Sequence, residues 1–214
     1  MASTLDLTPD QLLTTTRAVR KRLDFDRDVP MELILECVGV AQQAPSGSNT
    51  QGWHFVVVTE PELKAELGEF YRKAFDAYRN SPVYAGAIST GDARRDAQQQ
   101  RVASSAEFLA EHMGQAPVLV IPCVAGRPGA GSAAGLLGSI LPAAWSFMLA
   151  ARARGLGTCW TTLHLAYEKE SSALLGIPDN VSQALLTPLA FTKGTDFKPA
   201  FRPDPATITH VNGW

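Results

Sequence analysis

Two arginines near the start of the chain, Arg17 and Arg20, have the residue type and the spacing to bind a phosphate group. The sequence predicts that both lie late in a helix, where residues three positions apart share a face. Guanidinium groups bind phosphate well because they offer planar, paired donors. The neighbouring Lys21 and Arg22 fit a simpler role as solvent-exposed cations that favour the helix dipole. The pattern therefore favours an anion-binding site near residue 17.

Other reactive side chains do not combine into a site. Cys159, Ser139 and His164 lack the order and spacing of a catalytic triad. Glu168 and Glu170 suit the first turn of a helix better than an acid–base pair. The three cysteines and four histidines are scattered without metal-ligand spacing, so the sequence indicates neither a disulfide framework nor a zinc site, and a reducing cytoplasm fits best.

Three loops partly match ligand-binding motifs. Residues 126–132 follow a buried strand, but Ser132 stands where a phosphate-binding loop needs lysine, so we interpret this segment as a lid or connector. Residues 155–160 run from helix into strand, the reverse of a dinucleotide fingerprint, and the two glycines are interpreted as a helix stop. The polar residues 46–51 form either a solvated turn or, because Trp53 and a buried strand come next, a hydrogen-bonding rim for a planar ligand.

These side chains must be positioned by alternating helices and strands. Periodicity and capping signals predict helices at about 9–22, 30–44, 59–78, 94–112 and 169–175, and a long helix that ends near 154. Strands are expected at about 55–58, 117–124, 158–162 and 184–191. Capping boxes are predicted at Thr8 with Gln11 and at Thr59 with Glu62. This order predicts an α/β or α+β sheet flanked by helices, in one domain covering residues 1–214.

The composition argues against nucleic acid and membrane as partners. Lys and Arg total 19 and Asp and Glu total 21, so the net charge of −2 leaves no excess positive field. The uncharged run between Arg127 and Arg152 is long enough for a membrane span, but only residues 140–151 are strongly apolar, which is typical of a buried core helix. The N-terminus lacks the pattern of a signal peptide. We therefore expect a cytoplasmic protein.

The C-terminal tail, residues 192–214, contains three prolines and no long periodic segment. Its apolar residues are too many for a disordered tail: Phe197, Phe201, Ile208, Val211 and Trp214. The sequence therefore predicts that the tail packs on a surface outside its own core, such as a second subunit. Lys198 and Arg202 lie in this tail, and together with Arg17 or Arg20 they would complete a cationic pocket.

Four motifs, taken together and in order, carry a family resemblance. They are residues 16–20 (TRAVR), 44–53 (APSGSNTQGW), 155–162 (GLGTCWTT) and 197–203 (FKPAFRP), ahead of the ending at 210–214. From about residue 10 onward, the chain resembles the nitroreductase family of FMN-dependent oxidoreductases. The resemblance implies an α+β fold with a central, mostly antiparallel sheet flanked by helices, built as an intertwined homodimer with FMN at the interface.

The resemblance also implies roles for individual residues. Arg17 and Arg202 would hold the FMN phosphate with Lys198 as a helper, and Arg20 would lie toward the flavin pyrimidine edge and the ribityl chain. The loop near residue 46 would reach the flavin of the other subunit, and the backbone at 161–163 would offer an amide to flavin N5. The implied cofactor-binding set is Arg17, Ala18, Val19, Arg20, Pro45, Ser46, Asn49, Thr161, Thr162, Leu163, Lys198 and Arg202.

Three residues depart from the family pattern: Thr16 replaces an arginine, Ala18 a serine and Gly52 a proline.

The implied function is ping-pong hydride transfer from NADH or NADPH, through FMN, to a nitroaromatic, a quinone or a similar acceptor. No catalytic acid–base pair is needed, because the cofactor performs the chemistry. Two alternatives stay open: a flavin-binding or sequestering module without turnover, and a specialised reaction such as reductive dehalogenation or flavin destruction. The lid above the flavin is expected within residues 79–140.

Overall fold

The computed structural model, which describes residues 3–129 and 133–214, is organised around a six-stranded sheet. Residues 130–132, the end of the glycine-rich segment, lie outside the described residues. The elements in chain order are α1 Pro9–Thr15, β1 Leu23–Asp24, α2 Met31–Ala41, η1 Gly47–Asn49, β2 Trp53–Val58, α3 Pro61–Arg79, α4 Ala93–His112, η2 Met113–Gln115, β3 Val118–Ala125, α5 Ala133–Ala153, β4 Leu156–Thr158, η3 Leu163–Tyr167, α6 Glu168–Leu175, β5 Val181–Gln183, β6 Thr187–Thr192 and η4 Pro205–Ile208.

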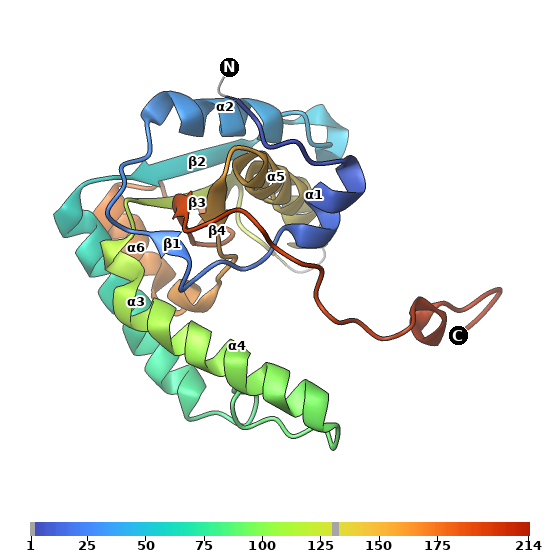
Figure 1. Cartoon of the computed structure of the whole chain (residues 1–214). Coiled ribbons are helices and arrows are strands. Elements are labelled where there is room, and N and C mark those ends of the chain that lie inside the picture. The colour runs from blue at the N-terminus through green and yellow to red at the C-terminus, as the bar shows by residue number, and fades with distance from the viewer. Residues whose placement is uncertain (1–2, 130–132) are drawn as a thin grey trace.

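The sheet has the order β1-β6-β3-β2, with β4 paired to β6 and β5 paired to β3. Within the described residues, every pairing between strands is antiparallel. Helices flank this sheet on both faces (Figure 1). The prediction of an α+β fold with a mostly antiparallel sheet is therefore confirmed.

The central strand β3 separates two hydrophobic clusters. Successive strand side chains point to opposite faces, and β3 is apolar on both. Leu119 and Ile121 pack into a cluster with α3 and the end of α4, whereas Val118 and Val120 pack into a cluster with α2 and α5. This two-sided burial explains why β3 reads as an uninterrupted apolar run, as the sequence predicted.

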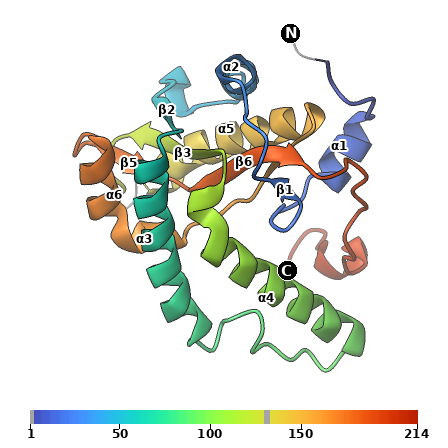
Figure 2. The ribbon, with the colours of Figure 1, turned by 60° about the vertical axis from the view of Figure 1, so that its left-hand side comes forward.

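Helices α3 and α4 form an arm that extends beyond the sheet (Figures 1 and 2). The end of α4 nearest the sheet buries Leu109, and Met113 follows it into the core. The first half of α4 is mostly charged and polar, so it contributes little to the core. One face of α4 in this arm is therefore not covered by the core, and it lies beside the segment that comes after α1.

Helix α5 is the core helix expected from the uncharged run. Its Phe147 is fully buried, and Ile140 and Met148 are at most 2% exposed. It is also the one described helix that is long and apolar enough to cross a membrane by length and composition. Its packing on α2 and on the sheet accounts for part of that apolar character, since 39% of the apolar window is buried.

Several predicted boundaries were wrong. Helix α1 ends at Thr15 rather than near Arg22, and the short strand β1 was not predicted. The capping box at Thr8 is present, but α3 begins after Glu60, whose side chain forms no cap hydrogen bond. The expected strand at 158–162 is β4 at Leu156–Thr158, and the last strand is divided between β5 and β6.

Candidate functional site

Three consecutive threonines at the end of α1 place the first arginine. The hydroxyls of Thr14, Thr15 and Thr16 each donate to the carbonyl four residues earlier, at 2.6 Å. Such side-chain bonds compete with helical backbone bonds, and β-branched residues weaken a helix further. Thr16, which stands where the family pattern has arginine, is an extended C-cap residue. Arg17 therefore begins an extended segment.

This extended segment is attached to the sheet. Ala18 forms a parallel bridge with Thr158, and the Val19 amide donates to the Thr158 carbonyl at 2.8 Å. The approach is close because Gly157 has no side chain: a Cβ there would lie 3.0 Å from Val19 Cγ1. Arg17 and Arg20 thus do not share a helix face, contrary to the prediction from their spacing. The sheet edge fixes their positions instead.

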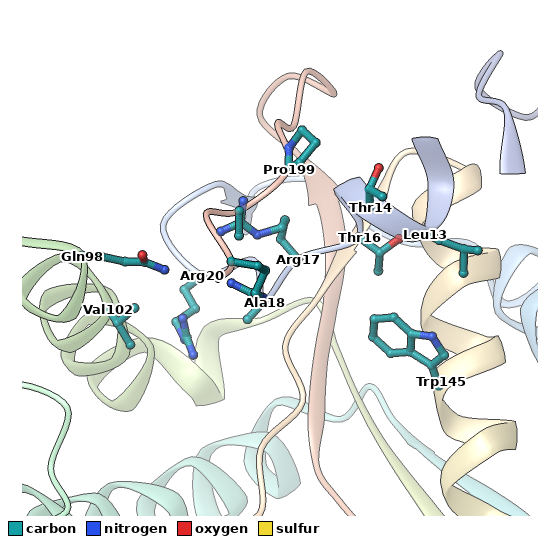
Figure 3. A pocket seen from close by; sticks show the side chains of 12 residues that line it. Leu13, Thr14, Thr16, Arg17, Ala18, Arg20, Gln98, Val102, Trp145 and Pro199 are labelled. Carbon is teal, nitrogen blue, oxygen red and sulfur yellow. The ribbon is translucent and has the colours of Figure 1, made fainter. Parts of the chain in front are cut away.

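Arg17 and Arg20 nevertheless meet in one cavity of about 550 Å³, a size typical of small-molecule sites. Figure 3 shows the two arginines and Ala18 between two walls: Gln98 and Val102 come from α4, and Trp145 comes from α5. The lining residues are Leu13, Thr14, Thr16, Arg17, Ala18, Arg20, Gln98, Val102, Trp145, Pro199, Ala200 and Arg202.

The cavity is strongly cationic. Arg17, Arg20 and Arg202 line it, and its lining contains no Asp or Glu. Arg17 Nη1 donates to the Lys198 carbonyl at 2.8 Å, and Arg20 Nη1 donates to Ser105 Oγ at 3.2 Å. Guanidinium donors converging on one space without a carboxylate form a binding site for an anionic ligand.

The tail reaches this cavity because its first residues are fixed on the body of the protein. The Phe197 ring lies between two guanidiniums, with Arg22 Cζ 4.2 Å and Arg152 Cζ 4.9 Å from its centroid. Arg152 is only 4% exposed and donates to the Thr195 carbonyl at 3.0 Å. Arg22, predicted to be a solvent-exposed cation, also pairs with Asp196 at 2.9 Å. This cluster brings the Lys198 carbonyl to Arg17 and Arg202 to the cavity, whereas Lys198 is not among the lining residues.

The loop that contains Pro45, Ser46 and Asn49 does not line this cavity. It packs on α5 instead, where the Gly47 amide donates to Ser139 Oγ at 3.0 Å. Its residues Ser48, Asn49 and Gln51 have φ between 50° and 53°. A non-glycine residue in this region is strained, and such strain clusters at ligand sites. The loop is held in shape by bonds from the Gln51 amide to Ser46 Oγ and from Gln51 Nε2 to Asn49 Oδ1.

The segment that contains Thr161, Thr162 and Leu163 also lies outside the lining of the cavity. It continues directly from β4, whose Thr158 carries the Ala18 bridge. The Thr161 amide donates to the Leu186 carbonyl at 3.1 Å. Thr162 is exposed, and among the described residues its amide has no hydrogen-bond acceptor.

The side chains rejected as a triad remain separate. Among the described residues, Ser139, Cys159 and His164 form no hydrogen bond with one another. Burial raises the pKa of the Cys159 thiol, so it stays protonated, and burial lowers the pKa of His164 to about 4. The part of the chain that the structure covers also holds no cluster of three potential metal ligands.

Several residues of the site were not predicted from the sequence. Gln98 and Val102 belong to a helix predicted only as polar, and Trp145 belongs to the core helix. Arg152 was noted only as the end of the uncharged run. The one sequence signal for the role of Arg152 is its position at the end of a buried apolar helix, because a buried charged residue needs a partner.

Comparisons with known proteins show what the chain as a whole is similar to. An iodotyrosine deiodinase from Haliscomenobacter hydrossis is 38% identical over 69 residues, which is 32% of this chain and only 30% of that protein. A protein of Archaeoglobus fulgidus, provisionally named an NADH dehydrogenase/NAD(P)H nitroreductase, is 26% identical over 200 residues, covering 91% of this chain and 93% of its own length. The structure of an FMN- and NADPH-dependent nitroreductase from Sphigopyxis sp. strain HMH aligns with a TM-score of 0.71 at 22% identity, over 97% of this chain and 100% of that one.

The family model described as the nitroreductase family matches residues 13–190. That range begins on α1 beside the cavity and ends within β6, so it includes both walls of the site and the sheet except for the last two residues of β6. The match spans most of the chain and includes the first three of the four motifs. The chain therefore belongs to the nitroreductase family.

Proposed function

We propose that this protein binds FMN in the Arg17 cavity and uses NADH or NADPH to reduce an electron-poor aromatic acceptor, such as a nitroaromatic or a quinone. The observation that carries the proposal is the convergence of Arg17, Arg20 and Arg202 on a cavity without acidic lining. The FMN and NADPH dependence of the Sphigopyxis enzyme supports the choice of cofactor and donor.

The residues present fit FMN. Its phosphate carries about two negative charges, which Arg17 and Arg202 would neutralise through paired donors, with Lys198 as a helper. Ala18 leaves space in the cavity wall, and Val19 holds this wall against β4. Arg20 would face the pyrimidine edge, where a guanidinium stabilises the negative charge that builds up on reduction.

Bound FMN supplies the two-electron hydride chemistry, so the protein has to bind, orient and exclude water. We assign the free amide of Thr162, within the segment 161–163, as a hydrogen-bond donor toward flavin N5. Thr161 and Leu163 fix this segment, since the Thr161 amide is already bonded to Leu186. Val102 and Trp145 provide apolar surface on the two walls of the cavity.

We further propose an intertwined homodimer. The strained loop at Pro45, Ser46 and Asn49 would then contact the flavin held by the other subunit. The tail supports this proposal, because Ile208, Val211 and Trp214 are 76%, 80% and 103% exposed on their own subunit. Exposed apolar residues of this size are typical of a surface that binds a partner. A cytoplasmic location also stays a prediction.

Reductive dehalogenation is the alternative that a specific observation favours, because the chain matches an iodotyrosine deiodinase over 69 residues. A flavin-binding module without turnover is the second alternative. Both share the cofactor site with the proposed reductase, and they differ from it in the fate of the electrons: the first passes them to a carbon–halogen bond, and the second passes them to no substrate.

The deciding experiment combines flavin titration with anaerobic reduction. The purified protein should retain or take up FMN and lose its flavin absorbance when NADH or NADPH is added without oxygen. Arg20→Ala and Arg202→Ala should each weaken FMN binding sharply. A protein that binds no FMN would refute the proposal, and an FMN-loaded protein that neither nucleotide bleaches would favour the module. Release of halide from a halogenated tyrosine, rather than reduction of nitroaromatics, would favour dehalogenation.

A further inference from the structure

A second cavity, of about 410 Å³, adjoins the first along one face of α4. Arg94, Gln98 and Arg101 line it at spacings of four and three residues, which places them on one helix face. The two cavities share Arg17 and Arg20 among their lining residues, so they lie side by side. A ligand on α4 would therefore lie next to the region proposed for the flavin.

This second cavity has more positive charge than the first. Four guanidiniums line it, and none of its lining residues is Asp or Glu. Among the described residues, neither Arg94 nor Arg101 forms an ion pair; Arg94 instead lies over the Phe201 ring, whose centroid is 4.4 Å from its Cζ. Arginines elsewhere on the surface, such as Arg72 and Arg127, are paired with glutamate. Arg94 and Arg101 therefore lack the acidic partners that Arg72 and Arg127 have.

If FMN binds as in the proposed function, on which this step rests, the arginines of the two cavities divide between FMN and a second anionic ligand. The FMN phosphate carries about two negative charges, and Arg17 with Arg202 balances them. Arg20 faces the flavin ring. Arg94 and Arg101 remain as two positive charges in a cavity whose lining contains no acidic residue. Cations concentrated in a cleft attract anionic ligands and raise their local concentration.

The other lining groups indicate what the anion is attached to. Val102 and the Phe201 ring contribute apolar surface, and Gln98 and Ser105 contribute neutral hydrogen-bonding groups. Apolar surface beside two guanidiniums is complementary to a flat aromatic molecule with a carboxylate at one end.

We propose that Arg94 and Arg101 of α4 select the acceptor, and that the preferred acceptors are electron-poor aromatic carboxylates. The two arginines bind the carboxylate and leave the aromatic ring near the flavin. Arg94 and Arg101 line only the second cavity, whereas Arg17, proposed to hold the FMN phosphate, lines both.

The first test measures binding without turnover. FMN-loaded, oxidised protein is titrated with benzoate and with benzamide, its uncharged analogue, and binding is followed by calorimetry and by the flavin difference spectrum. Benzoate should bind more tightly than benzamide, and the difference should shrink at high ionic strength. In the Arg94→Gln, Arg101→Gln double variant the preference should fall roughly tenfold, since each exposed charged contact contributes a few-fold in affinity.

The second test measures selectivity during turnover, as kcat/KM for para-nitrobenzoate relative to para-nitrobenzamide. Arg95→Gln is the matched control, because Arg95 is an exposed neighbour on the same helix and lines neither cavity. The double variant should lose the preference for the carboxylate, whereas Arg95→Gln should keep it. FMN affinity should be unchanged in both variants, which separates recognition of the acceptor from loss of cofactor.

Three results would overturn the inference. Equal binding of benzoate and benzamide by the wild-type protein would remove its basis, while FMN binding and reduction would leave the proposed function standing. A benzoate preference that survives in the double variant would assign the anion site to other residues. A rise in KM for NADPH but not NADH, with acceptor selectivity unchanged, would assign the two arginines to the donor's phosphate. Failure to bind FMN at all would instead refute the proposed function itself.

Discussion

Replacing Arg17 by glutamine should weaken the binding of FMN but not the binding of riboflavin. Arg17 is half-buried, and one of its five N–H donors is used by the Lys198 carbonyl at 2.8 Å. That bond holds the guanidinium at the cavity wall with the remaining donors available to a phosphate. Riboflavin lacks the phosphate, so the two ligands differ at the one group that Arg17 is proposed to hold.

The expected magnitude follows from the loss of a charge-assisted contact. A hydrogen bond to a charged group contributes about 1.5–3 kcal/mol. Its removal should raise the Kd of FMN roughly 10- to 150-fold. Glutamine keeps an apolar stem and a polar end but has no charge, so the Kd of riboflavin should change by less than about threefold, the effect of an ordinary surface change.

The assay is a titration of the cofactor-free protein, followed by the flavin fluorescence. Arg72→Gln is the matched control: it removes an arginine whose exposed pairs with Glu69 and Asp76 lie on α3, away from the cavity. Its FMN affinity should equal that of the wild type. An equal loss of FMN and riboflavin in Arg17→Gln would show that Arg17 supports the tail rather than the phosphate. Unchanged affinity for FMN would place the phosphate elsewhere.

Three further changes test the packing around the site. Phe147→Ala should lower the free energy of unfolding by about 3–5 kcal/mol, because Phe147 is fully buried, while Leu35→Ala, at a side chain 60% exposed, should cost far less; chemical denaturation compares them. Gly157→Ala should destabilise the fold by about 1–3 kcal/mol, because the new Cβ would lie 2.7 Å from Thr192 Cγ2. The new Cβ should also displace the segment that carries Arg17 and so weaken FMN binding. Thermal unfolding measures the first effect, and the FMN titration measures the second. Burial depresses the pKa of His164 from 6.5 to about 4, so between these pH values the native state binds fewer protons than the unfolded state. This contribution to stability should therefore be lost as the pH falls from 6.5 toward 4. Urea midpoints across that range should fall less steeply in His164→Phe than in the wild type.

The elements with a clear periodicity were predictable from the sequence, whereas the end of α1 was not. Strand β3 and helix α5 bury long apolar runs, so their type follows from composition alone. The Arg17 segment comes after a run of threonines. Whether it continues the helix or becomes extended depends on its pairing with β4, which lies about 140 residues away along the chain. Arg17 and Arg20 were predicted to act together because they would share a helix face. They do line one cavity, but the sheet edge rather than a helix face brings them there.

The position of the tail was harder to predict because its bonds use the backbone. Arg22 donates to the Lys193 carbonyl at 2.9 Å, Arg152 to that of Thr195 and Arg17 to that of Lys198. A carbonyl acceptor is present at every residue, so no sequence pattern distinguishes those that an arginine will bond. Asp196, which pairs with Arg22, and Phe197, whose ring lies near Arg22 and Arg152, are the tail residues whose side chains suit an arginine contact.

These backbone bonds also divide the tail into two parts with different physical requirements. Up to Arg202 the tail lines the cavity of its own subunit, and the arginines hold it there whatever the intervening side chains are. Beyond Arg202 every residue is exposed, and apolar side chains such as Trp214 find no core on this subunit to bury them. We propose that the second part is ordered on a surface outside this chain's own core, since an exposed tail gains too little from its own contacts to offset its conformational entropy. The cofactor site and the proposed dimer interface consequently meet at Arg202, the last residue of the tail that lines the cavity.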